Sequence, residues 1–442
     1  MRAVRCHEFS AVEAVPVREA TSLSSRPERQ QRDVRGRQQR SKQKVNYRPR
    51  ASPKRLRDVL KLDNIPIPRL RPQQERDHVL IRVYYAGIQY PDALQAQGLY
   101  QIRPPLPYIP GMDVTGVIVQ IFKRSDDDDD EDGDDDDMNN PPRRHLKVGT
   151  RVMATLWEHG GTGGLAEYFA VPIARVYPLP DTVPMSSAAN IGRNYFAAYH
   201  SLCTIGRIDA ATTSTTTTTT RSTRNPSVPP LVLVDGASGG VGMAAVELAK
   251  AMHCRVIAAV STPDRAVHPS GVGADAVLCY GRTRNDRVRF KRDVREMAVR
   301  LGHPNGIDLI IDVVQGDLFE TALLPNLRPM GTICLVGFTA GQKSIRPGLV
   351  LVKEANIVGS IWGRWAVEHP RRHAENVQRI LQFLATGAIR PRVNRIFDVS
   401  NFIEAFELFE TNQGRGNTVL CFEREGEEGN EIKQAKPLLS RL

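Results

Sequence analysis

The segment LVLVDGASGGVGMAAVELAK, residues 231–250, most constrains the fold of this chain of 442 residues. It opens with the apolar, β-favouring run Leu231–Asp235, which predicts a buried strand. A turn of small residues follows, and from Gly240 to about Met252 apolar residues recur with helical period. The run RVIAAV at 255–260 then supplies a second strand. The segment therefore predicts a strand, a turn and a helix that lead into another strand of the same sheet.

The turn matches the A-x-G-x-x-G form of the dinucleotide fingerprint. Gly239 would let a pyrophosphate approach the backbone, and Gly242 would let the helix pack closely on the strand. The free N–H groups at the helix start and the positive end of its dipole would face the phosphates. A tight turn with a purely structural role is the alternative, but the flanking strands and helix favour dinucleotide binding. The predicted phosphate-binding residues are Ala237, Ser238, Gly239, Gly240, Val241 and Gly242.

The end of the second strand indicates which dinucleotide binds. NAD-selective sites place Asp or Glu at this point, where the carboxylate accepts hydrogen bonds from the ribose 2′-OH. This chain has Ser261 and Thr262, followed by Arg265. Hydroxyl donors beside a cation suit a 2′-phosphate, which a carboxylate would repel. We therefore expect NADPH rather than NADH, unless Asp264 and not Arg265 faces the ribose.

Three low-complexity segments interrupt the chain. Residues 26–57 are dense in Arg and Lys, residues 126–137 are almost entirely acidic, and residues 212–220 are almost entirely Thr. Such segments cannot bury a core and predict disorder. The basic segment could bind nucleic-acid phosphates, but only Tyr47 is available for base stacking, so nucleic-acid binding is disfavoured. The predicted inserts span about 20–56, 124–142 and 211–228.

The remaining sequence indicates one domain interrupted by another. Residues 1–190 are β-rich, residues 191–359 alternate strand and helix, residues 360–425 are mixed, and residues 426–442 are a polar, flexible tail. No apolar run approaches the ~18 residues of a membrane span, and the start MRAVRCHEFS lacks the apolar region of a signal peptide. The six cysteines are scattered without a C-x-x-C pair. This pattern indicates a soluble protein of a reducing compartment.

Four stretches resemble a known family. They are AGIQYPDALQAQGLYQIRPPLPYIPGMDVTGVI (86–118), GASGGVGMAAVELAKAMHCRVIAAVST (236–262), GIDLIIDVVQGDLFETALLPNLRPMGTICLVGFTAG (306–341) and LVLVKEANIVGSIWGRW (349–365). These stretches are similar to the quinone oxidoreductase (zeta-crystallin-like) branch of the medium-chain dehydrogenase/reductase superfamily. The resemblance implies an α/β fold, in which a GroES-like catalytic domain of β-barrel type is interrupted by a Rossmann domain with a doubly wound parallel sheet. It also implies a homodimer.

The residues at the expected metal position argue against zinc. Zinc alcohol dehydrogenases of the superfamily carry Gly-His-Glu where this chain has Gly111-Met112-Asp113. A thioether is a poor Zn²⁺ ligand, and both the upstream cysteine ligand and the four cysteines of a structural zinc lobe are missing. We therefore predict a zinc-independent site. Without a Lewis acid, hydride transfer suits an acceptor that is already electrophilic, such as a quinone or an α,β-unsaturated carbonyl.

The resemblance also assigns residues to the site. It implies that Gln89, Asp92 and Tyr100 line the catalytic cleft. Tyr100 would donate a hydrogen bond to the reduced oxygen, with burial as a core aromatic residue as the alternative. Further cofactor contacts are implied for Tyr280 at the adenosine end and for Gly337, Phe338, Trp362 and Gly363 at the nicotinamide end.

Three positions depart from the family pattern. Gln89 stands where the family usually has Asn, and Ala197 where it usually has Thr. Asn417 follows Gly416 where the family has Gly-Lys.

These observations together predict a zinc-independent, NADPH-dependent oxidoreductase that acts on quinones or other activated carbonyls and alkenes. The alternatives are an enoyl- or alkenal-type double-bond reductase and, in a different class, a nucleotide-binding RNA-associated or structural protein. The chain ends in Ser440-Arg441-Leu442, which is similar to the Ser-Lys-Leu peroxisomal address. We therefore expect recognition by the peroxisomal import receptor, with a cytoplasmic location as the alternative.

Overall fold

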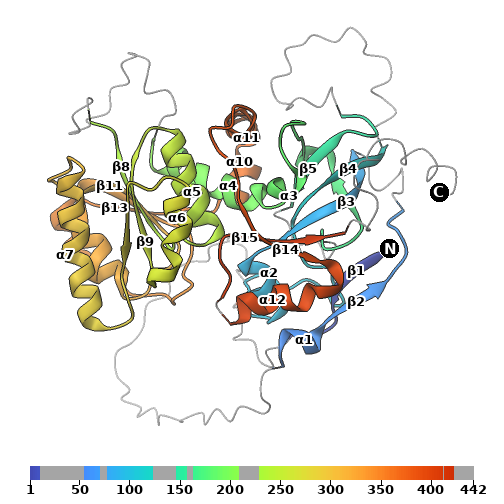
Figure 1. The fold of residues 1–442 in the computed structure, drawn as a ribbon, viewed down its shortest axis with the longest axis horizontal. Helices are drawn as coiled ribbons and strands as arrows, with labels where there is room; N and C mark the ends of the chain where they lie inside the picture. The colour runs from blue at the N-terminus through green and yellow to red at the C-terminus, as the bar shows by residue number, and fades with distance from the viewer. Residues whose placement is uncertain are drawn as a thin grey trace, which may run out of the picture.

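The computed structural model describes residues 1–9, 54–69, 77–122, 146–156, 163–208, 228–411 and 413–422. The described residues form two lobes that meet at helix α4 (Ile191–Tyr199) (Figure 1). The three predicted inserts fall almost wholly outside the described residues, and the tail with Ser440-Arg441-Leu442 falls entirely outside them. Within the described part of the chain, no helix is long and apolar enough to cross a membrane.

One lobe is built on a seven-stranded sheet in the order β14-β15-β3-β4-β5-β7, with β6 also paired to β3. All pairs are antiparallel except β14 with β15. Strands β14 and β15 come from the C-terminal part of the chain. This sheet is therefore built from two segments that the other lobe separates in sequence. The strands are β3 (His78–Ile88), β4 (Asp113–Phe122), β5 (Arg151–Thr155), β6 (Tyr168–Pro172), β7 (Val176–Pro178), β14 (Val393–Asp398) and β15 (Asn417–Cys421).

Shorter elements complete this lobe. A separate antiparallel pair joins β1 at the start of the chain to β2. Small helices cover the sheet, and their buried faces share a core with Ile81, Ile118 and Phe406. The remaining elements are β1 (Arg2–Cys6), β2 (Leu60–Asn64), α1 (Leu56–Val59), α2 (Tyr90–Ala96), η3 (Ile173–Arg175), α3 (Met185–Ala188), η7 (Val399–Asn401) and α12 (Phe402–Glu410).

The other lobe holds a six-stranded sheet in the order β10-β9-β8-β11-β12-β13, in which every pair is parallel. All five residues of β8 are buried, as expected for a parallel strand covered on both faces. The predicted strands at 231–235 and 255–260 are confirmed. The strands are β8 (Leu231–Asp235), β9 (Arg255–Val260), β10 (Ala276–Cys279), β11 (Ile307–Asp312), β12 (Leu327–Leu335) and β13 (Asn356–Gly359).

Helices cover both faces of this parallel sheet (Figure 1). Val232 and Val234 of β8 share a core with α5, whereas Leu231 and Leu233 share another with α7. The helical segments of this half are η4 (His200–Ile205), α5 (Gly240–Ala251), η5 (Pro263–Arg265), α6 (Val267–Gly271), α7 (Arg284–Arg300), η6 (Phe319–Leu323), α8 (Leu324–Asn326), α9 (Pro347–Lys353), α10 (Trp362–Glu368) and α11 (Pro370–Ala385).

The combination confirms the expected fold class, a GroES-like lobe and a doubly wound parallel sheet. From β8 the chain adds strands first on one side (β9, β10) and then on the other (β11, β12, β13). Open α/β sheets bind ligands at such a switch point, here between the carboxyl ends of β8 and β11. The predicted domain boundaries at 190, 359 and 425 stay predictions.

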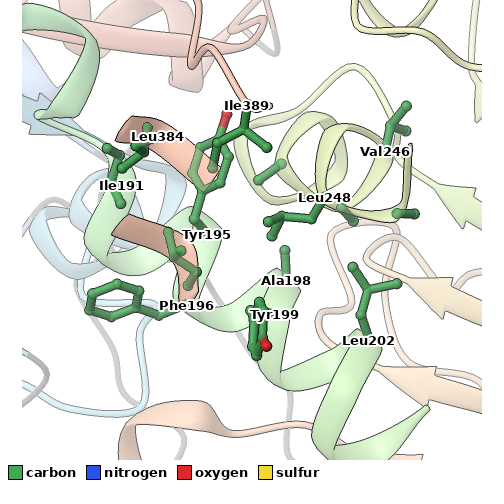
Figure 2. Packing of buried hydrophobic residues seen from close by; sticks show 14 of the residues in the cluster. Ile191, Tyr195, Phe196, Ala198, Tyr199, Leu202, Val246, Leu248, Leu384 and Ile389 are labelled. Carbon is green, nitrogen blue, oxygen red and sulfur yellow. The ribbon is translucent and has the colours of Figure 1, made fainter. Parts of the chain in front are cut away.

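Helix α4 packs against α5 and joins the lobes through one apolar core. Figure 2 shows Ala198 of α4 facing Leu248 of α5, and both are buried in one cluster with Tyr195 of α4 and Val246 of α5. The cluster is closed from the C-terminal part of the chain, by Leu384 of α11 and by Ile389. The turn that begins α5 is therefore held at a fixed place relative to both lobes.

Gly242, in the first turn of α5, should be the least replaceable glycine of this contact. A Cβ there would clash with the carbonyl oxygen of Gly236 and lie 2.8 Å from Cα of Ala237, which are both backbone atoms. We expect Gly242→Ala to lower the free energy of unfolding by about 1–3 kcal/mol. Gly348→Ala in α9 is the matched control, because its Cβ meets nothing within 4 Å. This control should change stability by less than about 1 kcal/mol. Urea unfolding checks both, and equal stabilities would contradict the packing argument.

Candidate functional site

The turn between β8 and α5 leaves its outer side open. Gly239 is the N-cap of α5, and a Cβ built on it would meet only the carbonyl oxygen of Gly236, at 3.5 Å. Gly240 is different, because its Cβ would lie 2.5 Å from Nδ2 of Asn194 on α4. Glycine at 239 thus leaves the backbone accessible to a phosphate, whereas glycine at 240 and 242 permits close packing. The turn fits a dinucleotide pyrophosphate.

The C-terminal segment before β15 also contacts this turn. The backbone N–H of Gly416 donates to the carbonyl oxygen of Ser238 at 2.9 Å. Asn417, which replaces the family's usual Lys, is buried and accepts a 2.8 Å hydrogen bond from Nδ2 of Asn194. Asparagine at 417 therefore has a structural role, because its amide connects β15 of the seven-stranded sheet to α4.

The residues at the end of β9 separate into two groups. Nη1 of Arg265 lies 3.4 Å from Oγ of Ser238, which places the guanidinium beside the phosphate turn. Asp264 instead pairs with Arg415 at 2.5 Å. A hydrogen bond from Thr262 lowers the pKa of Asp264, and Arg415 and Arg265 act in the same direction. Arg265 is thus directed to the turn, while the carboxylate of Asp264 is held by Arg415.

The other residues expected at the cofactor lie in varied surroundings. Tyr280 packs edge-on against Phe290 with a centroid distance of 5.8 Å, and burial raises its pKa. Phe338 is 45% exposed, next to Gly337 beyond the carboxyl end of β12. Trp362 packs edge-on against Phe196 of α4 at 5.6 Å, and Gly363 beside it is buried.

Two of the three residues predicted as catalytic are brought together. The backbone N–H of Gln89 donates to Oδ2 of Asp92 at 2.8 Å, where Gln89 is the N-cap of α2. Nε2 of Gln89 then reaches β4 and donates to Oδ2 of Asp113 at 2.7 Å. All three side chains are buried. Tyr100 is partly exposed and belongs to none of the buried clusters of the described residues, and its role in the cleft stays a prediction.

Asp113 is the hydrogen-bond centre of this group. Its Oδ2 also accepts from the backbone N–H of Arg193 at 2.9 Å, and its Oδ1 accepts from the hydroxyl of Thr155. Burial raises the pKa of Asp113 to about 6, although the hydroxyl of Thr155 and the nearby Arg193 oppose the shift. Burial likewise raises the pKa of Asp92. Two carboxyl groups are thus held out of water at the junction of the lobes.

The sequence analysis missed the cation of this group, Arg193. Its Nη1 lies 3.1 Å from the Met112 sulfur and 3.9 Å from Oδ1 of Asp92, and 13% of its side chain is exposed. An arginine in the buried, mostly apolar segment IGRNYFAAYH was the available signal, because an isolated charge in such a segment needs a partner or a function.

The side chains gathered around Asp113 are poor ligands for a zinc ion. Met112 offers a thioether, Gln89 turns its amide N–H to Asp113, and the guanidinium of Arg193 would repel a divalent cation. Across the described ranges, no three His, Cys, Asp or Glu side chains gather at a point that could hold a metal. The side-chain chemistry of this place is that of hydrogen bonding and one fixed positive charge.

A second buried acid pair lies beneath the phosphate turn. Asp235 ends β8 and Asp312 ends β11, and the two are direct partners in the sheet register. Oδ1 of Asp235 accepts from Gly236 N–H at 2.8 Å, and Oδ1 of Asp312 accepts from Gln315 N–H at 2.7 Å. Burial raises the pKa of both groups, that of Asp312 to about 6, and the charge of Asp312 raises the pKa of Asp235 further. The two carboxyls therefore titrate as a pair that favours protonated forms in the folded chain.

Comparisons with known proteins agree on the class of fold and activity. A zinc-binding dehydrogenase model matches residues 240–385, and an alcohol dehydrogenase GroES-like domain model matches residues 75–181. A quinone oxidoreductase-like protein 2 homolog of Nematostella vectensis is 26% identical over 344 residues, which cover 77% of this chain and 81% of that protein. The quinone oxidoreductase of Homo sapiens is 28% identical over 354 residues, which cover 79% of this chain and 89% of that protein.

A solved structure extends the similarity to the whole fold. The quinone oxidoreductase of Thermus thermophilus, whose structures include a complex with NADPH, is 25% identical with a TM-score of 0.56. The match covers 84% of this chain and 98% of that one.

The raised pKa values of Asp235 and Asp312 should make stability depend on pH. Both groups contribute fully to stability below about pH 4, the ordinary range of a carboxyl pKa, and lose this contribution as pH rises through their raised pKa values, which in the case of Asp312 is about 6. We expect Asp235→Asn, whose amide can donate permanently to Asp312, to flatten this dependence and raise Tm at about pH 8 by about 2–4 °C. Differential scanning calorimetry from about pH 5 to 8 measures it.

Asp317→Asn is the control for this experiment. Asp317 is exposed, and its ion pair with Lys343 lowers its pKa, so it titrates below the tested range. An Asp235→Asn curve parallel to the curves of the wild type and of this control would show that Asp235 has no raised pKa in the folded chain.

Proposed function

Because the chain belongs to the medium-chain dehydrogenase/reductase superfamily, in its quinone oxidoreductase branch, we propose that it is a zinc-independent, NADPH-dependent oxidoreductase that reduces quinones or other activated carbonyls and alkenes. The observation that carries the proposal is the turn at Gly239, which is open to a phosphate and has Arg265 at its side. When bound, the reduced nicotinamide supplies the hydride.

The charges beside the turn support NADPH over NADH. Arg265 is directed to Ser238, and the carboxylate of Asp264 is occupied by Arg415. A 2′-phosphate at this place would meet a guanidinium able to form charge-assisted hydrogen bonds, with the hydroxyls of Ser261 and Thr262 close by in sequence. A free 2′-OH would lack the carboxylate that normally accepts its hydrogen bonds.

The proposed choice of acceptor rests on the side chains that stand at the family's metal position. Met112, Gln89 and Arg193 are unsuited to bind Zn²⁺, so the acceptor must delocalise negative charge without a metal. Quinones and enones do this through conjugation. The buried amide of Gln89 is fixed by Asp113, which positions the start of α2 next to the acceptor.

NADPH oxidation tests the activity directly. Purified protein is given NADPH with a panel of benzoquinones, naphthoquinones, alkenals and unactivated ketones, with and without a zinc chelator. Turnover of a quinone or alkenal, unchanged by the chelator, is the expected result, and a preference for alkenals would indicate a double-bond reductase. Turnover of none of the panel, or loss of activity on chelation, would contradict the proposal.

A homodimer through the edge of the parallel sheet is also part of the proposal. Strand β13 is the last strand of its sheet among the described residues and exposes Val358, and the preceding α9 exposes Leu351 and Val352 at 77% and 80%. An exposed edge strand beside exposed aliphatic side chains favours pairing with a second chain. Two-fold pairing of β13 with its copy would continue the sheet and cover these residues.

Arg265→Gln should weaken NADPH binding selectively. The loss of one charge-assisted contact to a phosphate corresponds to about 10- to 100-fold in Kd, whereas the Kd for NADH should change less than about twofold. Quenching of tryptophan fluorescence on titration with each nucleotide measures both constants. Arg292→Gln on the exposed face of α7 is the control and should leave them unaltered. An equal loss for NADH and NADPH would remove the assigned role of Arg265.

Val358→Lys should dissociate the dimer. A lysine on each copy of β13 would place like charges opposite each other at the proposed junction. In sedimentation velocity, the wild type is expected as a dimer at micromolar concentration and the variant mainly as a monomer. Val288→Lys on α7, where the valine is 65% exposed, should stay dimeric. A monomeric wild type, or a dimeric Val358→Lys variant, would exclude this interface.

A further inference from the structure

The side chain of Arg193 is mostly, but not fully, buried, and few of its hydrogen bonds are made. Its contacts within the described part of the chain are the Met112 sulfur at 3.1 Å and Oδ1 of Asp92 at 3.9 Å, the second beyond hydrogen-bond distance. A guanidinium carries five N–H donors, and a thioether is a weak acceptor. Holding such a cation with only 13% of its side chain exposed is costly unless another acceptor arrives.

The neighbouring carboxyl that could neutralise Arg193 is engaged by other donors. Asp113 receives Gln89 Nε2 and the backbone N–H of Arg193 at Oδ2, and Thr155 at Oδ1. The side chain of Arg193 is thereby left for another partner, although its own backbone anchors the helix to β4. Oδ2 of Asp92 is held by the N–H of Gln89, and its Oδ1 faces Nη1 of Arg193 at 3.9 Å, which is an ion pair beyond hydrogen-bond distance.

The helix geometry directs Arg193 away from the core. Figure 2 shows Ile191 and Tyr195 of α4 pointing into the shared core with α5 and α11. A residue two positions from each of them lies on roughly the opposite face of the helix. That face meets Met112 and Asp113 at the start of β4 and Asp92 on α2, where the predicted catalytic residues gather.

We propose that Arg193 is a catalytic residue whose guanidinium binds the acceptor oxygen and stabilises the negative charge that develops there. This inference rests on the proposed function and adds the electrophile that a zinc-independent site otherwise lacks. A fixed cation in a site shielded from water stabilises an oxyanion far better than water does, because it does not have to reorient as charge develops. A quinone or enone carbonyl also matches the planar fork of N–H donors.

The electron balance of the step follows from hydride addition to a conjugated carbonyl. The hydride brings two electrons to the acceptor carbon and forms a C–H bond there, while the conjugated π bond breaks and its electron pair moves to the oxygen. NADPH is oxidised by two electrons. The oxyanion on Arg193 then takes a proton from water, and a proton shift between carbon and oxygen gives the hydroquinone or the saturated carbonyl.

A phenol that ionises reports on Arg193 without any cofactor. 4-Nitrophenol absorbs differently as a neutral phenol and as a phenolate, so its apparent pKa when bound is read from the spectrum. The charged groups facing Arg193 are Asp92 and Asp113, and both would raise that pKa. A bound pKa below that of free 4-nitrophenol therefore identifies the guanidinium as its partner, and a pKa at or above the free value would overturn the proposal.

Variants add a kinetic measurement. Arg193→Met should abolish the lowering of the 4-nitrophenol pKa and reduce kcat/KM for the acceptor by about 10²–10³-fold, with an unchanged Kd for NADPH. Arg193→Lys should restore part of both because it keeps the charge. Arg328→Met is the matched control. Arg328 on β12 pairs with buried Asp308 on β11 at 2.7 Å, in the parallel sheet and away from Arg193.

The outcomes separate this inference from the proposed function. An Arg193→Met variant with the same bound 4-nitrophenol spectrum as the wild type would overturn the role of Arg193. The role would also be overturned if this variant lost NADPH affinity by the same factor as it lost kcat/KM. Absence of NADPH turnover in every variant would instead contradict the proposed function. Should Arg193→Met fail to fold by circular dichroism, the wild-type titration of 4-nitrophenol still decides.

Discussion

The packing of α4 against α5 is the contact on which the rest of the structure depends. Asn194 lies against Gly240 on one side and donates to Asn417 on the other, so one side chain meets the phosphate turn and the C-terminal strand together. Next to it on α4, the Tyr195 hydroxyl donates to buried Glu247 of α5. An apolar core surrounds these bonds (Figure 2). The turn, α4 and β15 are thereby held in a fixed relative position, as a site that aligns two reactants requires.

Charged groups are concentrated where this contact excludes water. Asp92, Asp113 and Arg193 meet at the junction of the lobes, and Asp235 and Asp312 meet under the phosphate turn. Each group costs free energy to bury, and each of the four carboxyls accepts a hydrogen bond from a backbone N–H. Proteins commonly sacrifice stability in this way at functional sites.

Local patterns were sufficient to predict much of the fold. The strands predicted at 231–235 and 255–260 match the observed bounds, because uninterrupted apolar runs have few other stable placements. The reason for glycine at 242 was also correct, since a helix start and a strand end approach within one short turn. Trp362 was expected beside the nicotinamide, and the structure shows it against Phe196 in an aromatic contact that no local pattern encodes.

Residue types at short spacing were enough to predict the βα unit correctly, and they also predict the residues of the phosphate turn and a zinc-independent site at Gly111-Met112-Asp113. The surroundings of Arg193 emerged only from the folded chain, because its contacts come from α2 and β4, about 80 to 100 residues earlier in the sequence. The pairing of Asp264 with Arg415 and the meeting of Asp235 with Asp312 emerged in the same way. Such contacts follow from strand order and helix packing, which bring distant residues together without any signal in the local sequence.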